Sequence, residues 1–171
     1  QHPAFGRLKS NIFYFDNNKP TQSKLLEDIV WDASRKKYWI TTAYGTGIYE
    51  LAKDKNIATP IPFPEPKKSD DVEMFGDIIV DAQKRVWAVR RYYGLYQYSD
   101  ELKMFTKPLL KGPVPDSLIG NVSRLTVDKK GNIWAFAKNY FIYYDAIQGT
   151  TEQYPLRWDP DFDGQRKIIL S

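Results

Sequence analysis

The stretch that decides the fold is NVSRLTVDKKGNIWAFAKNYFIYYD, residues 121–145. It contains the apolar run Leu125-Thr126-Val127, which ends at Asp128. A polar turn follows, in which Gly131 can take a positive φ, and a strand led by Trp134 comes next. After a loop, the stretch ends in a segment rich in aromatic residues, which are favoured in strands. The pattern predicts consecutive antiparallel strands joined by short turns.

The same pattern occurs three times, at a period near 47 residues. The other copies are LLEDIVWDASRKKYWITTAYGTGIYEL, residues 25–51, and MFGDIIVDAQKRVWAVRRYYGLYQY, residues 74–98. One tryptophan recurs at constant phase, as Trp39, Trp87 and Trp134. A repeat of this length indicates one supersecondary unit per copy, stacked on its neighbours. We therefore expect the three tryptophans to fill the core between adjacent units.

Each copy is typical of a β-propeller blade, which has four short antiparallel strands. The fourth strands are predicted at Lys103–Thr106 and Thr151–Tyr154, and less clearly at Lys55–Ile61. The fold class is all-β, and residues 1–171 form one partial β-propeller domain. Its blade repeats cover roughly residues 25–63, 74–107 and 121–155, with partial blades at residues 11–16 and 166–171. Because propellers need more blades to close a ring, we expect a fragment of a larger propeller.

Composition excludes several classes of function. The chain of 171 residues has 25 basic and 21 acidic side chains, and a net charge of +4 is too weak a field to indicate nucleic-acid binding. It has no cysteine and a single histidine, His2, which argues against disulfides, thiolate metal sites and a Ser-His-Asp triad. No apolar run approaches the length of a membrane span. We predict no catalytic residue, no cofactor and no membrane segment. Because the chain begins Gln1-His2-Pro3 rather than with Met, we expect a processed chain or an excised piece.

The repeated motif is apolar-x-Asp-x-x-Gly-x-apolar-Trp, followed by a loop and Gly-apolar-Tyr-x-Tyr. It resembles the two-component regulator propeller repeat. Asp128 to Trp134 matches most clearly, and Asp81 to Trp87 with Gly94 to Tyr98 is next. The first copy, Trp39-Ile40-Thr41-Thr42 with Gly47-Ile48-Tyr49, has Thr41 where the family has Gly. The resemblance covers roughly residues 11–170.

This resemblance implies a seven-bladed propeller in the periplasmic sensor region of a bacterial histidine kinase or hybrid two-component system. Many members of that family sense oligosaccharides, so the resemblance also implies carbohydrate sensing and signal transduction. No kinase or receiver sequence occurs here, and the kinase would lie outside this chain. The same repeat occurs in secreted or cell-surface proteins, and a propeller scaffold for protein–protein interaction without a kinase remains the alternative. The expected partners are an oligosaccharide and the remaining blades or another copy of the chain.

A ligand site is predicted at the loops between the second and third strands of each repeat, because these loops share one face of a propeller. Aromatic faces stack on sugar rings, while Arg, Lys and Asn hydrogen-bond hydroxyl or acidic groups. The alternative is that the tyrosines only cover the ends of the core and the cations are solvated. The candidate residues are Tyr44, Arg90, Arg91, Tyr92, Tyr93, Lys138, Asn139 and Tyr140.

Two further patterns compete with this site. Asp159-Pro160-Asp161-Phe162-Asp163-Gly164 resembles the start of a calcium loop, but Leu170 stands where an EF-hand needs Glu, so no metal site is predicted. A polysaccharide lyase using Tyr92 and Arg91 is an enzymatic alternative that the scarcity of histidine disfavours. The pairs Lys84-Arg85 and Lys129-Lys130 are expected on the face opposite the predicted ligand loops, where they would be solvated.

Overall fold

The structure is a computed structural model that describes residues 14–15, 26–43, 47–63, 74–114, 119–158 and 168–169. Twelve of its strands form three antiparallel four-stranded arrays in chain order, and β1 (Tyr14–Phe15) adds a fifth, parallel strand to the first of them. The first sheet contains β2 (Leu26–Asp32), β3 (Lys37–Thr42), β4 (Ile48–Ala52) and β5 (Ile57–Ile61). The second contains β6 (Phe75–Val80), β7 (Val86–Arg90), β8 (Gly94–Ser99) and β9 (Met104–Thr106). The third contains β10 (Val122–Val127), β11 (Ile133–Ala137), β12 (Tyr140–Tyr144) and β13 (Thr151–Pro155).

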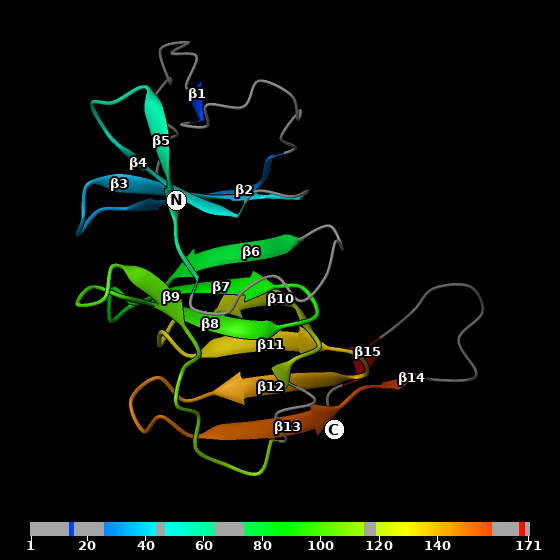
Figure 1. Ribbon diagram of the computed structural model, residues 1–171. Helices are drawn as coiled ribbons and strands as arrows, with labels where there is room; N and C mark the ends of the chain where they lie inside the picture. The colour runs from blue at the N-terminus through cyan, green and yellow to red at the C-terminus, as the bar shows by residue number, and fades with distance from the viewer. Residues whose placement is uncertain are drawn as a thin grey trace.

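The three sheets share one strand order and one position of register shift, as the sequence repeat predicted. In each, strands adjacent in sequence are adjacent in the sheet. Each first strand carries a register shift at its start, at Leu26/Asp28, Phe75/Ile78 and Val122/Arg124. The sheets follow one another as layers from β2–β5 through β6–β9 to β10–β13 (Figure 1). The first strands β2, β6 and β10 pack against one another from layer to layer.

The repeated Asp and Trp form one local unit. The indole Nε1 of Trp39 donates to Asp32 at 3.1 Å, and that of Trp87 donates to Asp81 at 2.9 Å. The other carboxylate oxygen accepts backbone N–H groups of the following turn, such as that of Arg85 at 2.8 Å from Asp81. A carboxylate that accepts both bonds fixes the turn and the tryptophan together.

Two apolar cores fill the spaces between the sheets. The core between the first and second sheets includes Trp39, Tyr96, Tyr98 and Phe105, and the core between the second and third includes Trp87, Leu95, Ile133, Ile142 and Tyr144. Trp39 and Trp87 are 0% exposed. Burial of such a ring contributes a few kcal/mol, on the order of 3 kcal/mol or more when it is removed.

The sheets are also joined by hydrogen bonds between their first strands. The carboxylate of Asp28 in β2 accepts the N–H of Ile78 in β6 at 3.0 Å. Asp77 in β6 accepts the N–H of Leu125 in β10 at 2.8 Å. The third sheet has Arg124 at this place, and its guanidinium instead donates back to Asp77 at 2.8 Å. The link therefore occurs twice and ends at the third sheet.

Several details differ from the sequence expectations. The turn residue with positive φ is a lysine in the first two repeats, Lys36 (φ 54°) and Lys84 (φ 65°), whereas the third has Gly131 (φ 86°) as expected. Arg85 is not simply solvated, because it bonds Asp81 and the carbonyl of Ala146 in the next sheet at 3.1 Å. Trp134 is only half-buried, unlike Trp39 and Trp87.

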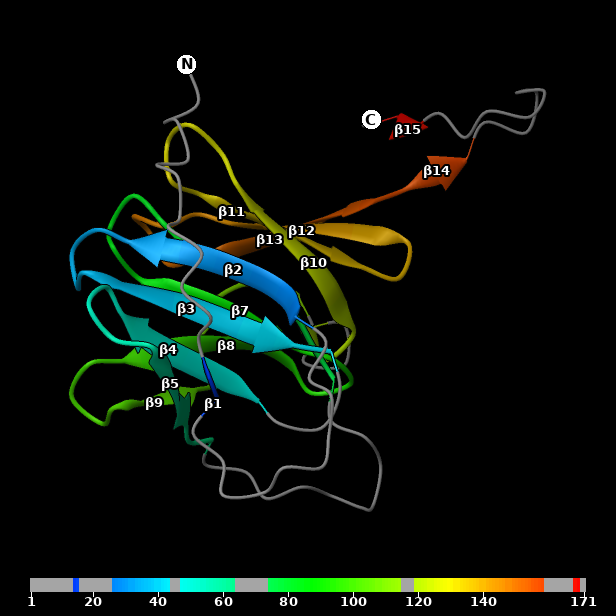
Figure 2. The ribbon, with the colours of Figure 1, turned by 90° about the horizontal axis from the view of Figure 1, so that it is seen from above.

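The two predicted partial blades are described only in part. β1 (Tyr14–Phe15) pairs parallel with β5, so it lies at the edge of the first sheet rather than in a sheet of its own. β14 (Arg157–Trp158) pairs antiparallel with β15 (Ile168–Ile169). Figure 2 shows β14 leading away from the end of β13. The assignment of these segments to neighbouring blades stays a prediction.

Candidate functional site

The two described loops between second and third strands, at residues 91–93 and 138–139, lie at corresponding ends of the second and third sheets. Of the loop between β3 and β4, Tyr44 lies outside the described residues, so its expected role stays a prediction. The loop between β7 and β8 contains Arg91, Tyr92 and Tyr93. The turn between β11 and β12 contains Lys138 and Asn139, both exposed. The structure thus describes two of the three predicted loops.

The two arginines at the end of β7 are already engaged within the protein. Arg90 is 1% exposed, and its guanidinium lies 4.0 Å from the ring centre of Tyr93 and 5.4 Å from that of Phe63. Arg91 donates from Nη2 to Glu27 in β2 at 2.9 Å, which joins the second sheet to the first. Both side chains therefore support the loop, and Arg90 does not reach the surface where a ligand was expected to meet it.

Tyr92 and Tyr93 line a pocket of about 340 Å³, the loop pocket. Its other lining residues are Leu95, residues 107–110, Ile119 and Gly120. Two of its side chains are unusually exposed for their size, Tyr92 at 80% and Leu109 at 87%. Lys107 is the single charged residue in this lining. An exposed apolar rim with one cation is an arrangement found at binding sites.

The backbone of Tyr92 supports the same interpretation. Its φ is 69°, a left-handed conformation that is uncommon for a bulky residue. Such positions cost about 1–3 kcal/mol and cluster at functional sites. Gly94 follows two residues later with a φ of 99°, and a Cβ at that position would lie 2.6 Å from the carbonyl oxygen of Ile119. The loop therefore presents Tyr92 to solvent at an energetic cost.

Lys138, Asn139 and Tyr140 do not join this pocket. Tyr140 is partly buried and packs against the core between the second and third sheets. The carbonyl of Asn139 accepts the N–H of Leu156 at 2.7 Å, and Lys138 takes a positive φ of 53°. These residues form a well-anchored turn at the same end of the sheets, separate from the loop pocket.

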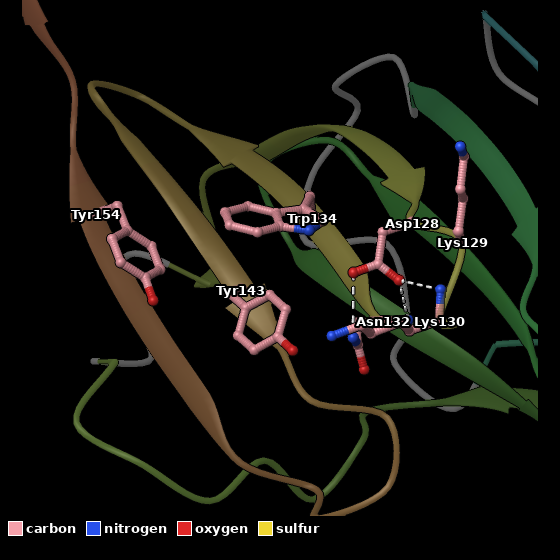
Figure 3. Close-up of a pocket in the computed structure, with 7 residues that line it drawn as sticks. All are labelled: Asp128, Lys129, Lys130, Asn132, Trp134, Tyr143 and Tyr154. Carbon is pink, nitrogen blue, oxygen red and sulfur yellow. Dashed lines mark hydrogen bonds between the residues drawn. The ribbon is translucent and has the colours of Figure 1, made fainter. Parts of the chain in front are cut away.

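A second and larger pocket, of about 570 Å³, lies on the outward face of the third sheet. We call it the end-face pocket, and Figure 3 shows three rings from adjacent strands beside the turn at the end of β10. The ring centres of Trp134 and Tyr143 lie 4.9 Å apart, and those of Trp134 and Tyr154 lie 5.8 Å apart. The pocket is lined by Asp128, Lys129, Lys130, Asn132, Trp134, Tyr143 and Tyr154.

Neighbouring groups shift the pKa values of three side chains that line this pocket. Burial raises the pKa of Asp128, but hydrogen bonds from Asn132, Lys130 and Trp134 outweigh it, and the pKa is lowered overall. Burial and nearby carboxylates raise the pKa of Tyr143. The hydrogen bond from its hydroxyl to Glu152 raises the pKa of Tyr154. At neutral pH the pocket therefore holds one carboxylate, two exposed lysines and two neutral phenols.

The sequence pattern does not single out this pocket, because it places Trp134 in the core and Lys129-Lys130 in solvent. One signal is present. The residue that pairs with the repeated tryptophan is Glu50 in the first sheet and Gln97 in the second, but Tyr143 in the third. An aromatic residue at that register extends the Trp134 ring surface.

In the part of the chain that the structure describes, no group of three or more His, Cys, Asp or Glu side chains is placed to hold a metal ion. The calcium-like segment at residues 159–164 lies outside the described residues. No helix among the described residues is long and apolar enough to cross a membrane.

Comparison with solved structures finds extracellular domains that contain a segment with a similar fold. The extracellular domain of BT4673 from B. thetaiotaomicron, described as a one component system, superposes with a TM-score of 0.62. The identity is 18%, over 85% of this chain and 20% of that chain. A second structure of the BT4673 extracellular domain, described as a hybrid two component system, gives a TM-score of 0.61 and 19% identity over 77% of this chain and 18% of that one. The chain shares the fold of a segment of that domain.

The chain thus spans about a fifth of the length of these solved structures. The extracellular domain of BT3049, described as a hybrid two component system, has a TM-score of 0.47 and 14% identity over 92% of this chain and 28% of that chain, a likeness too weak to support a shared fold. No protein-family model matches the sequence, and no curated protein matches it. The structural neighbours are nevertheless extracellular domains of the class that the repeat motif resembles.

Proposed function

We propose that this chain is a segment of the extracellular, periplasmic sensor region of a two-component system. In this proposal its three sheets are three blades of a larger β-propeller, and a kinase outside the chain receives the signal. The observation that carries it is the fold shared with a segment of the BT4673 extracellular domain. The repeated Asp–Trp unit supports it independently, because its sequence motif resembles the repeat of two-component regulator propellers. The segment itself acts as a binding module and not as an enzyme.

The proposed ligand is an oligosaccharide, bound at the loop pocket. Tyr92 offers an exposed ring for the apolar C–H face of a sugar, and Tyr93 lines the same pocket. Lys107 supplies a donor for a hydroxyl or a carboxylate of the sugar. The volume of about 340 Å³ lies at the lower end of the range for small-ligand sites, which suits one or two sugar rings.

The test is calorimetric titration of the 171-residue chain with a panel of neutral and uronic-acid oligosaccharides. We expect at least one member to bind, and Tyr92→Ala to weaken it about fivefold or more, as for a residue at the centre of a contact. Ile147→Ala is the matched control, because Ile147 is equally exposed (82%) but lies in the turn between β12 and β13, at the opposite end of the third sheet.

Two results count against this proposal. If no oligosaccharide binds, the carbohydrate ligand is wrong and an interaction scaffold without a kinase becomes the better account. If a sugar binds but Tyr92→Ala changes its affinity no more than Ile147→Ala does, the ligand lies elsewhere on the molecule.

A further inference from the structure

The loop pocket lies across the joint between the second and third sheets. Tyr92, Tyr93 and Leu95 form one side of it, from the loop after β7 and from β8. The other side is formed by residues 107–110, which follow β9, and by residues 119–120, which precede β10. An occupant of this pocket would therefore contact the second sheet and the segment that leads to the third sheet at the same time.

Residues 107–112, which we call the strap, cross from the second sheet to the edge of the third. Figure 1 shows the chain passing from the end of β9 to the start of β13, where Lys111 forms a parallel bridge with Thr150. The N–H of Lys111 donates to the carbonyl of Gly149 at 3.3 Å, and its carbonyl accepts the N–H of Thr151 at 2.6 Å. The hydroxyl of Thr151 donates to the same carbonyl at 3.0 Å. We call these three hydrogen bonds the anchor.

The anchor fits closely around the backbone of the strap. Thr151 is buried, and a Cβ added at Gly112 would overlap both its carbonyl oxygen and its hydroxyl. Leu110, one residue before the anchor, packs against the core between the second and third sheets. The preceding residue, Leu109, is 87% exposed at the rim of the loop pocket. The strap thus turns one leucine toward the core and the other toward solvent.

Pocket and anchor share the strap, and this sharing couples them. Residues 107–110 lie outside the strands, and such segments open locally at a lower free energy than the sheets that they join. Because these residues are a pocket wall and continue directly into the anchor, loss of the anchor frees the wall to move away from Tyr92 and Tyr93. An occupant that contacts both sides of the pocket favours the anchored arrangement. By linkage, the two effects are equal in free energy.

We propose that the strap is a conformational device that couples occupancy of the loop pocket to the edge of the third sheet at residues 149–151. A filled pocket holds the strap on that edge, and release of the edge removes one wall of the pocket and weakens binding. The inference rests on the loop pocket as the ligand site of the proposed function. It adds a route by which binding beside Tyr92 is felt at the opposite end of the third sheet.

The first test needs no ligand and uses the absence of cysteine from the sequence. Leu110→Cys introduces a single thiol on the packed side of the strap, and its rate of reaction with a maleimide reports how often the strap lifts. Thr151→Val removes only the hydroxyl bond of the anchor and should raise this rate about threefold. Gly112→Ala displaces the whole anchor and should raise it about tenfold or more. Leu109→Cys is the matched control, and it should react fast in every background because this position is exposed.

A second thiol separates lifting of the strap from general loss of stability. Ala88→Cys lies in β7 at a position that is 0% exposed, so its labelling reports opening of the second sheet. Gly112→Ala should leave that rate unchanged. Equal acceleration at Leu110→Cys and Ala88→Cys overturns the proposal, because the variant then loosens the whole chain. An unchanged rate at Leu110→Cys in the Gly112→Ala background also overturns it.

The second test is calorimetric titration with the member of the oligosaccharide panel that binds the parent chain. Gly112→Ala should weaken its binding about tenfold, and a saturating amount of it should slow labelling of Leu110→Cys about tenfold. Gly149→Ala is the matched control, with less than a twofold effect on affinity. That glycine also takes a positive φ (70°), but an added Cβ would meet nothing closer than 3.9 Å.

The two tests fail in different ways. Oligosaccharide affinity that Gly112→Ala leaves unchanged overturns the coupling and leaves the sensor function standing. If no oligosaccharide binds, the proposed carbohydrate ligand is wrong, whereas thiol labelling of Leu110→Cys still decides whether the anchor holds the pocket wall.

Discussion

The bond between Asp77 and the N–H of Leu125 predicts a specific loss of stability. Asp77→Ala leaves the backbone N–H of Leu125, in a partly buried interface, without its acceptor at 2.8 Å. An unsatisfied donor of this kind costs about 1–3 kcal/mol. The ion pair with Arg124 adds at most about 1 kcal/mol, because the arginine side chain is 63% exposed. We expect a total near 2 kcal/mol, since these terms overlap.

Three comparisons separate the hydrogen bond from the ion pair. Asp77→Asn keeps a carbonyl acceptor for Leu125 and should cost about 1 kcal/mol. Arg124→Ala removes only the exposed ion pair and should cost less than about 1 kcal/mol. Asp28→Ala removes the equivalent bond to Ile78 between the first and second sheets, so it should cost about as much as Asp77→Ala.

Urea unfolding at pH 7 and 25 °C gives these costs directly. For a chain of this size a loss of 2 kcal/mol also lowers Tm by about 4–8 °C. Hydrogen exchange supplies a local readout, since the Leu125 amide should exchange at least about tenfold faster in Asp77→Ala. The reasoning is refuted if Asp77→Ala costs no more than Arg124→Ala, or if exchange at Leu125 is unchanged.

Two other predictions concern the turns. Burial alone would raise the pKa of Asp32, but hydrogen bonds from Ser34, Arg35 and Trp39 hold it at about 2. Since this folded-state pKa is below the unfolded value, a contribution of about 1–2 kcal/mol is complete above pH 4 and is lost as the pH falls toward 2. The urea midpoint of the parent chain should therefore fall across that window. The difference in urea midpoint between the parent and Asp32→Asn should shrink over the same window, and a constant difference contradicts the assignment. Gly94→Ala should cost about 2 kcal/mol or more, because its new Cβ would lie 2.6 Å from the carbonyl oxygen of Ile119 at a φ of 99°. Gly47→Ala, at a φ of 105° with open space around it, should cost only the backbone strain, and equal midpoints for the two variants would show that the close contact relaxes.

The spacing of Asp and Trp is enough to predict the three sheets, because both residues perform the same local task in every copy. Strand alternation locates the fourth strands, including the less clear one that forms β5 at Ile57–Ile61. What the spacing does not contain is the identity of the neighbour across each sheet face. Trp134 therefore looks identical to Trp39 and Trp87 in sequence, although its face is open in the structure.

The candidate site is predictable only in part, for a similar reason. The loop position of Tyr92 and Tyr93 follows from the repeat, and both line the loop pocket. Arginines are mostly exposed, so the sequence places Arg90 at the surface, yet it is buried against aromatic rings. One of those rings is Phe63, which lies two residues after the end of β5 and stacks on Phe105 with ring centres 5.4 Å apart. The repeat pattern does not predict that the side chains of Phe63 and Arg90 come into contact.

The change from Asp77 in the second sheet to Arg124 in the third distinguishes the outward face of the third sheet from the two filled interfaces. Two sheet–sheet contacts combine a covered tryptophan, an arginine from the turn and a carboxylate that accepts a backbone N–H. The third sheet keeps the tryptophan but has Asn132 at the place of Arg85, since both residues bond the repeated aspartate from the backbone N–H and the side chain. The amide oxygen of Asn132 accepts the N–H of Ala146 within its own sheet. Arg124 offers no acceptor to the first strand of a following sheet. As the structure describes it, the outward face of the third sheet thus lacks two of the three contacts that join the earlier sheets.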